Sequence, residues 1–154
     1  MKNVEVNILL KFSKDTGDLF VELKNDNNID NYLNRNREEM LQPMPLHEYL
    51  SKLLIEKNLN KQEIIKKSNL DEVYAYHIFS GNRKNPSRPK ILAIGFAMEL
   101  NLEEMQYLLR YAKKSPLYPR NQWDSVIISA IEQKLNVIDT NLLLSKLGET
   151  LLLE

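Results

Sequence analysis

From residue 46 onward, apolar side chains recur at the three- and four-residue spacing of amphipathic helices, and this pattern is repeatedly cut short. Asn60, with Glu63 three residues later, is typical of a helix start. Gly81 is typical of a helix end, where the chain turns into a left-handed conformation. Residues 46–114 are therefore expected to fold as a domain of short helices rather than as one long helix or a sheet.

Four helices are predicted at the start of this domain. They cover residues 46–58, 60–67, 71–80 and 88–100. The segment KILAIGFAMEL in the last of them is apolar nearly all round, which favours a buried central helix. Gly95, inside that helix, is expected to allow close contact with a second helix, at a cost of roughly 1 kcal/mol in helix propensity.

The N-terminal residues show a different period. Residues 4–12 alternate apolar and polar side chains, which is typical of a half-buried strand. After a turn at Gly17, the segment LFVELK places Leu19, Val21 and Leu23 at every second position. Residues 1–24 are therefore predicted to form a β-hairpin appendage.

Two further segments complete the expected organisation. Residues 25–45 are predicted to hold a polar helix and a linker broken by prolines. Residues 115–154 are predicted to form a helical C-terminal extension packed on the domain, in which Asp139 caps the last helix. The apolar tail ETLLLE is expected to pack on the domain or on a partner. The overall fold class is thus mainly α, with an N-terminal β-hairpin.

Composition restricts the class of protein. The chain has 154 residues, of which 43% are hydrophobic and 27% are charged, and these values are typical of a globular protein. The absence of cysteine excludes disulfides and thiolate metal sites. No apolar run is long enough to cross a membrane, and no signal segment opens the chain. We therefore expect a cytoplasmic protein.

Charge is unevenly distributed along the chain. The net charge is zero, but residues 46–100 carry nine basic and six acidic side chains, and the segments on either side are net acidic. Much of the basic excess falls between residues 82 and 90, where no acidic residue occurs. The four cations there are Arg83, Lys84, Arg88 and Lys90. This segment either binds a nucleic-acid backbone or is a solvated turn between two helices.

Known catalytic patterns are missing or are explained by structure. Ser87 and Lys90 match an S-x-x-K motif, but the companion motifs are absent and Pro89 suits a helix start. There is no phosphate-binding glycine loop and no H-E-x-x-H motif. His47 and His77 are the only histidines, so a metal site is not expected. We expect no enzyme activity, cofactor or metal.

Two short helices joined by a tight turn, within NKQEIIKKSNLDEVYAYHIFSGNRKNPSRPKILAIGFAMEL, are typical of a helix-turn-helix. This stretch resembles the XRE-type (Cro and phage-repressor-like) family, most specifically at I-F-S-G-x-R-x-x-P-S, residues 78–87. Residues 29–154 also resemble small Firmicute putative regulators that carry a helical C-terminal extension. The resemblance implies a bacterial DNA-binding protein.

By this resemblance, residues 71–80 form the recognition helix. Ala75 and Ile78 would face the core. The side chains that would face the major groove are Glu72, Val73, Tyr76 and His77. Gln62 would lie near a phosphate, and residues 82–90 would follow the DNA backbone. An acidic Glu72 and an apolar Val73 depart from the polar or basic groove face that is common in the family.

Two functions follow as expectations. The first is a transcriptional regulator that binds double-stranded DNA as a homodimer, with the N-terminal hairpin as one route to dimerisation. The alternative is a protein-interaction module that keeps the helix-turn-helix scaffold but has lost tight DNA binding. Zero net charge, together with Glu72 and Val73, favours the alternative.

Overall fold

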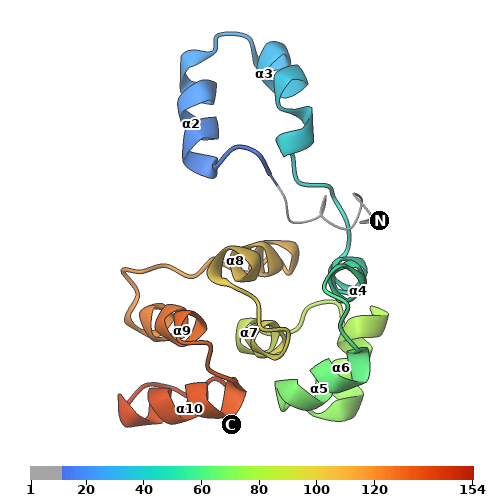
Figure 1. The fold of residues 1–154 in the computed structure, drawn as a ribbon, viewed down its shortest axis with the longest axis vertical. Coiled ribbons are helices and arrows are strands. Elements are labelled where there is room, and N and C mark those ends of the chain that lie inside the picture. The colour runs from blue at the N-terminus through green and yellow to red at the C-terminus, as the bar shows by residue number, and fades with distance from the viewer. Residues whose placement is uncertain (1–11) are drawn as a thin grey trace. The chain divides into compact units, whose positions relative to one another are not determined.

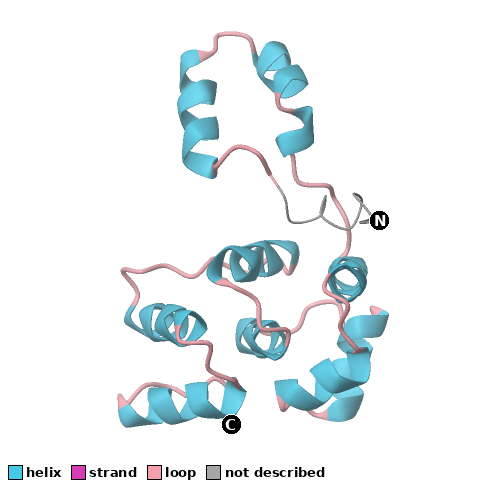
Figure 2. Cartoon of the chain, in the orientation of Figure 1, coloured by secondary structure: helices cyan, strands magenta, loops and turns pink. Residues whose placement is uncertain are grey.

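The computed structural model describes residues 12–154, whose regular structure is entirely helical (Figures 1 and 2). The chain divides into two compact units, residues 1–43 (unit 1) and residues 44–154 (unit 2). Unit 1 contains α2 (Thr16–Asn25), α3 (Ile29–Arg35) and the 3-10 helix η1 (Arg37–Glu39). Unit 2 contains α4 (Leu46–Glu56), α5 (Lys61–Ser68), α6 (Glu72–Ser80), α7 (Arg88–Ala97), α8 (Leu102–Tyr111), α9 (Gln122–Glu132) and α10 (Val137–Lys146). The mainly α fold class is confirmed.

The predicted β-hairpin is wrong in its second strand, and most of its first strand, residues 4–11, lies outside the described residues. The segment LFVELK belongs to α2, and Gly17 lies in the first turn of this helix rather than in a loop. The Asp15 carboxylate caps the helix by accepting a hydrogen bond from the backbone N–H of Asp18 at 2.8 Å. The apolar residues at positions 19, 20, 21 and 23 fit both the helical spacing and the two-residue spacing of a strand. The Asp15 cap is the local signal that favours the helix.

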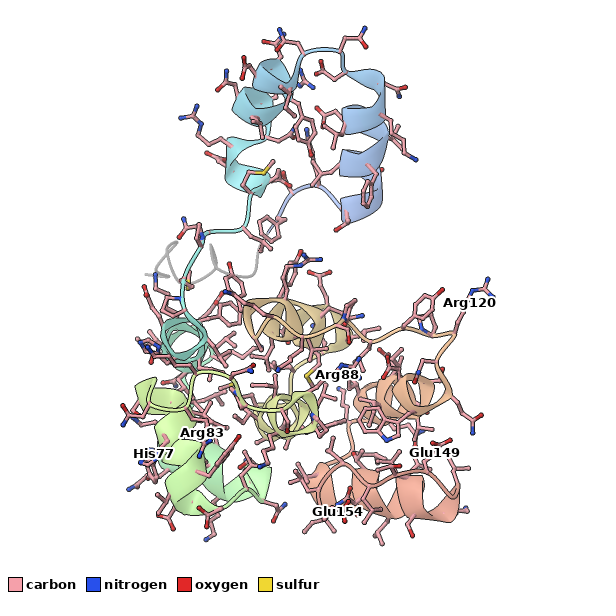
Figure 3. The ribbon with its side chains drawn as sticks, turned by 180° about the vertical axis from the view of Figure 1, so that it is seen from behind. His77, Arg83, Arg88, Arg120, Glu149 and Glu154 are labelled. Atoms are coloured by element: carbon pink, nitrogen blue, oxygen red, sulfur yellow. The ribbon has the colours of Figure 1, made fainter. Side chains whose placement is uncertain are left out.

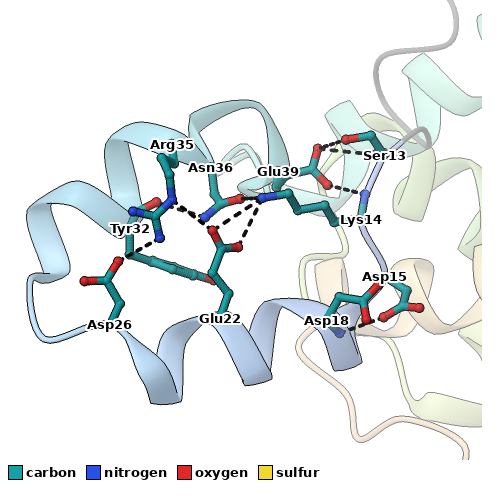
Figure 4. Close-up of polar contacts among 10 residues, drawn as sticks. All are labelled: Ser13, Lys14, Asp15, Asp18, Glu22, Asp26, Tyr32, Arg35, Asn36 and Glu39. Atoms are coloured by element: carbon teal, nitrogen blue, oxygen red, sulfur yellow. Dashed lines mark hydrogen bonds and ion pairs between the residues drawn. The ribbon is translucent and has the colours of Figure 1, made fainter.

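Polar contacts hold α2 against α3 within unit 1 (Figure 4). Glu22 accepts hydrogen bonds from Lys14 Nζ at 3.1 Å and from Arg35 Nε at 2.9 Å. Arg35 also donates to Asp26 at 2.7 Å. These contacts lower the pKa of Glu22, through Lys14 first and Arg35 second. The network joins both helices and the residues that precede them.

The centre of unit 2 is α7, as its all-round apolar sequence predicted. Every residue from Ile91 to Ala97 is buried, and α7 packs against α5, α8 and α10. Figure 1 shows these helices around it. Apolar burial is the main stabilising term in such a bundle, because each fully buried aliphatic side chain contributes about 1.5–3 kcal/mol.

Gly95 permits the close contact between α7 and α8 that was expected of it. A Cβ atom at this position would collide with the side chain of Met105, which is itself fully buried, and would also press on Leu108. A side chain on α7 at the crossing point of these two helices would therefore require Met105 to move.

The C-terminal extension packs against the 46–114 domain, because α9 contacts α8 and α10 contacts α7. Trp123 donates its indole N–H to the backbone carbonyl of Thr150 at 2.8 Å. Asn141 accepts a hydrogen bond from the N–H of Leu152 and donates to the carbonyl of Leu153, both at 2.7 Å. Leu152 is buried. These hydrogen bonds hold the apolar tail against α9 and α10 of the extension itself.

One predicted cap in this extension is wrong. α10 begins at Val137, and its cap is Asn136, whose side chain accepts from the N–H of Asp139 at 2.8 Å. Asp139 therefore lies inside the first turn. The helix therefore starts three residues earlier than the predicted cap implies, and its first residue, Val137, is buried.

Candidate nucleic-acid interface

The turn between α5 and α6 is short and fixed by local hydrogen bonds. Asn60 caps α5 by accepting from Glu63 N–H at 3.1 Å, and Asp71 caps α6 by accepting from Tyr74 N–H at 3.0 Å. Between them, Asn69 takes a left-handed conformation with φ of 59°. The buried hydroxyl of Ser68 donates to the carbonyl of Ile65. The two helices therefore have a defined relative orientation.

The two faces of α6 divide as expected. Ala75 and Ile78 are fully buried, which confirms their predicted core positions. The opposite face presents the four predicted groove residues: Glu72, Val73 and His77 are exposed, and Tyr76 is half-buried. The exposed fraction of Val73 is 64%, so an apolar side chain occupies the middle of this surface. Gln62, in the first turn of α5, is exposed as well.

The loop that follows α6 leaves the helix by a tight turn. Gly81 has φ of 90°, and a Cβ at this position would collide with the imidazole of His47 on α4. The backbone N–H of Arg83 donates to the carbonyl of His77 at 2.9 Å, and Pro86 is buried. The backbone of the loop is therefore fixed at both ends, while residues 82–85 between them are exposed; Figure 3 shows Arg83 and His77 at the surface of unit 2.

Three of the four predicted backbone-binding cations have no acidic partner in the described part of the chain. No carboxylate from residues 12–154 forms an ion pair with Arg83, Lys84 or Lys90. Lys114 adds a fourth cation beside the loop, because its Nζ donates to the side chain of Asn85 at 2.8 Å. The result is a local positive surface on a protein of zero net charge.

Arg88, the remaining predicted contact, is used inside the protein. Its guanidinium donates to both carboxylate oxygens of Asp124, at 2.8 and 3.0 Å, and to the backbone carbonyls of Ser115 and Pro116. The Asp124 side chain is only 8% exposed and also accepts from the N–H of Tyr118. Arg88 therefore anchors α9 and the preceding loop to the start of α7, and we leave it out of the proposed interface.

Two residues near the loop were not among the predicted contacts. Tyr74, on α6, lies beneath two of the cations: Arg83 Cζ is 4.7 Å from the centroid of its ring, and Lys90 Nζ is 4.1 Å away. Lys114 follows α8, which packs against α7, and reaches the loop at Asn85. The nine-residue spacing between Tyr74 and Arg83 is not a recognisable sequence pattern, and the same holds for the spacing between the loop and Lys114. Neither contact could therefore be predicted from the sequence.

The described residues contain no group of three or more histidine, aspartate or glutamate side chains arranged to hold a metal ion. Among the same residues, no helix has the length and apolar content needed to span a membrane. Comparisons of the chain with protein-family models, with curated proteins and with solved structures found no match.

Proposed function

We propose that this protein is a DNA-binding transcriptional regulator of the XRE type, in which α6 enters the major groove. The support is the order of five short helices, α4 to α8, with a three-residue turn between α5 and α6. The observation that carries the proposal is that the exposed face of α6 lies next to the loop: the backbone N–H of Arg83, a cation without an acidic partner among residues 12–154, donates to the carbonyl of His77.

Phosphate would be bound by Arg83 and Lys84 in the loop and by Lys90 in the first turn of α7. Each contact between a cation and a phosphate releases counterions, and the slope of log affinity against log salt changes by about −0.9 per contact. Three contacts therefore correspond to a slope of about −2.7 per protomer. Binding of that strength is weak, so a homodimer on a two-fold site is part of the proposal. Dimerisation through a β-hairpin is not part of the proposal, because α2 replaces the predicted second strand.

Base readout would come from the exposed face of α6. The carboxylate of Glu72 can accept a hydrogen bond from the amino group of cytosine, and the methyl groups of Val73 can contact the methyl of thymine. Tyr76 and His77 lie on the same face and complete the surface. Each well-formed contact of this kind contributes about 1–3 kcal/mol of discrimination between bases.

The test is a binding titration of fluorescent random duplex DNA by anisotropy, at roughly 50 and 200 mM salt, the range over which the phosphate term changes most. The test variant is Arg83→Glu with Lys84→Glu. The matched control is Arg120→Glu with Lys146→Glu, which changes net charge equally at two exposed positions in the α8–α9 loop and on α10. Arg120 extends from the far side of unit 2 relative to Arg83 (Figure 3).

We expect the wild type and the control to bind at low salt and the test variant to lose at least tenfold in affinity. Absence of wild-type binding at 50 mM salt would reject the DNA proposal. Equal losses in the test and control variants would show that net charge matters and that the position of the loop does not.

A protein-interaction module is the second candidate, and one observation favours it. Ile138, Leu142 and Leu147 are all more than half exposed in or directly after α10, and Val73 is equally exposed on α6. If wild-type protein fails to bind DNA while Val73→Asp or Leu142→Asp alters self-association in sedimentation velocity, this second function replaces the first.

A further inference from the structure

The basic loop is associated with an aromatic ring whose position gives it a specific role. Tyr74 is on α6, Arg83 is in the loop, and Lys90 is in the first turn of α7. Arg83 Cζ and Lys90 Nζ lie 4.7 and 4.1 Å from the centroid of the Tyr74 ring, within the range of a cation–π interaction. One ring thus brings together two cations from different elements.

Lys84 provides an internal comparison. It is exposed and adjacent to Arg83, yet no cation–π contact of its ammonium group is present among residues 12–154. Lysine and arginine side chains have many rotamers, and ordering them on binding carries an entropic cost. Arg83 and Lys90 are already ordered on the Tyr74 ring in the free protein, so they lose less conformational entropy when a ligand binds. Lys84 has no such contact and loses more.

We propose that Tyr74 is a positioning residue for phosphodiester backbone, holding Arg83 and Lys90 as a preorganised pair that contacts adjacent phosphates. This inference rests on the proposed DNA-binding function. Tyr74 itself is half-buried and contacts the ligand only through the cations it orients. The pairing is electrostatic with the face of the ring, so the ring is required and the hydroxyl is not.

The first test compares Tyr74→Phe, which keeps the ring, with Tyr74→Leu, which removes it. Affinity for a fixed duplex is measured by anisotropy at several salt concentrations, at a temperature where circular dichroism shows every variant to be folded. Tyr74→Leu should bind about three- to tenfold more weakly, as expected for the loss of two cation–π contacts at a partly exposed site. Tyr74→Phe should remain within about twofold of the wild type.

The second test is a double-mutant cycle, which separates positioning from general destabilisation. Arg83→Gln and Lys84→Gln are each measured in the wild-type and the Tyr74→Leu backgrounds. If Tyr74 positions Arg83, the loss caused by Arg83→Gln should be smaller when the ring is already absent. The loss caused by Lys84→Gln should be the same in both backgrounds, because Lys84 does not use the ring.

The outcomes separate this inference from the proposed function. Wild-type protein that does not bind DNA removes the proposed function itself. If the wild type binds DNA and Tyr74→Leu binds it with the same affinity, the inference is overturned, even if the variant has a lower melting temperature. Tyr74 would then be only a structural contact between α6 and α7. An equal loss in Tyr74→Phe also overturns it, because the hydroxyl would then be responsible. If Tyr74→Leu does not fold, Tyr74→Met replaces it in both tests.

Discussion

Units 1 and 2 are both helical, but different interactions hold them together. Within residues 12–43, the buried side chains are Tyr32 and Asn36, and ion pairs of Glu22 with Arg35 and Lys14 join α2 to α3 and to the segment before α2. Unit 2 instead surrounds α7 with fully buried aliphatic side chains, and its two best-shielded ion pairs are Arg88–Asp124 and Lys57–Glu104. The strength of charged contacts depends on pH and salt, whereas the stability gained from apolar burial depends on how completely side chains fill the core. The two units should therefore fail under different conditions.

The largest effect should come from a cavity in unit 2. Leu92 is fully buried on α7, and Leu92→Ala should lower the free energy of unfolding by about 2–5 kcal/mol. Trp123 is the only tryptophan and lies in unit 2, so its fluorescence during urea denaturation reports on this unit alone. Leu142→Ala, at a position 63% exposed on α10, is the control and should change stability by less than about 0.5 kcal/mol. Equal effects would contradict the central role of α7.

A smaller loss should follow from breaking the ion pair that anchors the extension. Asp124→Asn keeps the shape of the side chain but leaves the Arg88 guanidinium without its charged partner. We expect a loss of about 1–3 kcal/mol in the free energy of unfolding, measured by the same fluorescence. Glu48→Gln, which removes an exposed pair with Lys52 at 3.9 Å, should cost less than about 0.5 kcal/mol. A similar loss for both substitutions would mean that shielding of the Arg88 pair has no effect.

Acid should act on unit 1 before unit 2. The pKa of Glu22 is lowered by Lys14 and Arg35, and that of Asp26 by the N–H of Asn28 and then by Arg35. A carboxyl with a lowered pKa stabilises the fold above its ordinary pKa and loses this contribution as pH falls. The ordinary values are 4.5 and 3.8. Helical circular dichroism should therefore decrease below about pH 4.5, while Trp123 fluorescence remains unchanged.

Glu56, in unit 2, responds to acid in the opposite direction to Glu22. Burial raises its pKa, so its contribution is complete below the ordinary value of 4.5 and decreases as pH rises. The matched variant for unit 1 is Glu22→Gln, which should reduce the acid-dependent loss of helix. A simultaneous change in tryptophan fluorescence, or an unchanged acid transition in Glu22→Gln, would contradict the difference between the units.

Much of unit 2 was predictable because its local signals agree with its packing. The cap at Asn60, the left-handed Gly81 and the apolar stretch around Gly95 each depend on neighbouring residues in the sequence. Unit 1 was misassigned where a short apolar segment fitted two periods and one cap, Asp15, decided the outcome. Local pattern is informative when several signals concur, and it fails when only one is present.

The candidate site was predictable in its helices but not in the roles of its charged side chains. Arg88 and Lys90 are two residues apart and looked equivalent in sequence. Only tertiary packing brings Asp124, 36 positions later, against Arg88, and places Tyr74 beneath Lys90. Which residues a long, flexible side chain contacts depends on the three-dimensional arrangement of several helices. No spacing rule along the chain predicts that arrangement.

The two-point contact between Arg88 and Asp124 has a consequence for the evolution of this chain. A lysine at 88 offers a single ammonium group and cannot reproduce the planar fork that also reaches the carbonyls of Ser115 and Pro116. Related sequences that retain the C-terminal extension should therefore inherit arginine and aspartate together at these positions. Sequences that lose the extension are free to change both.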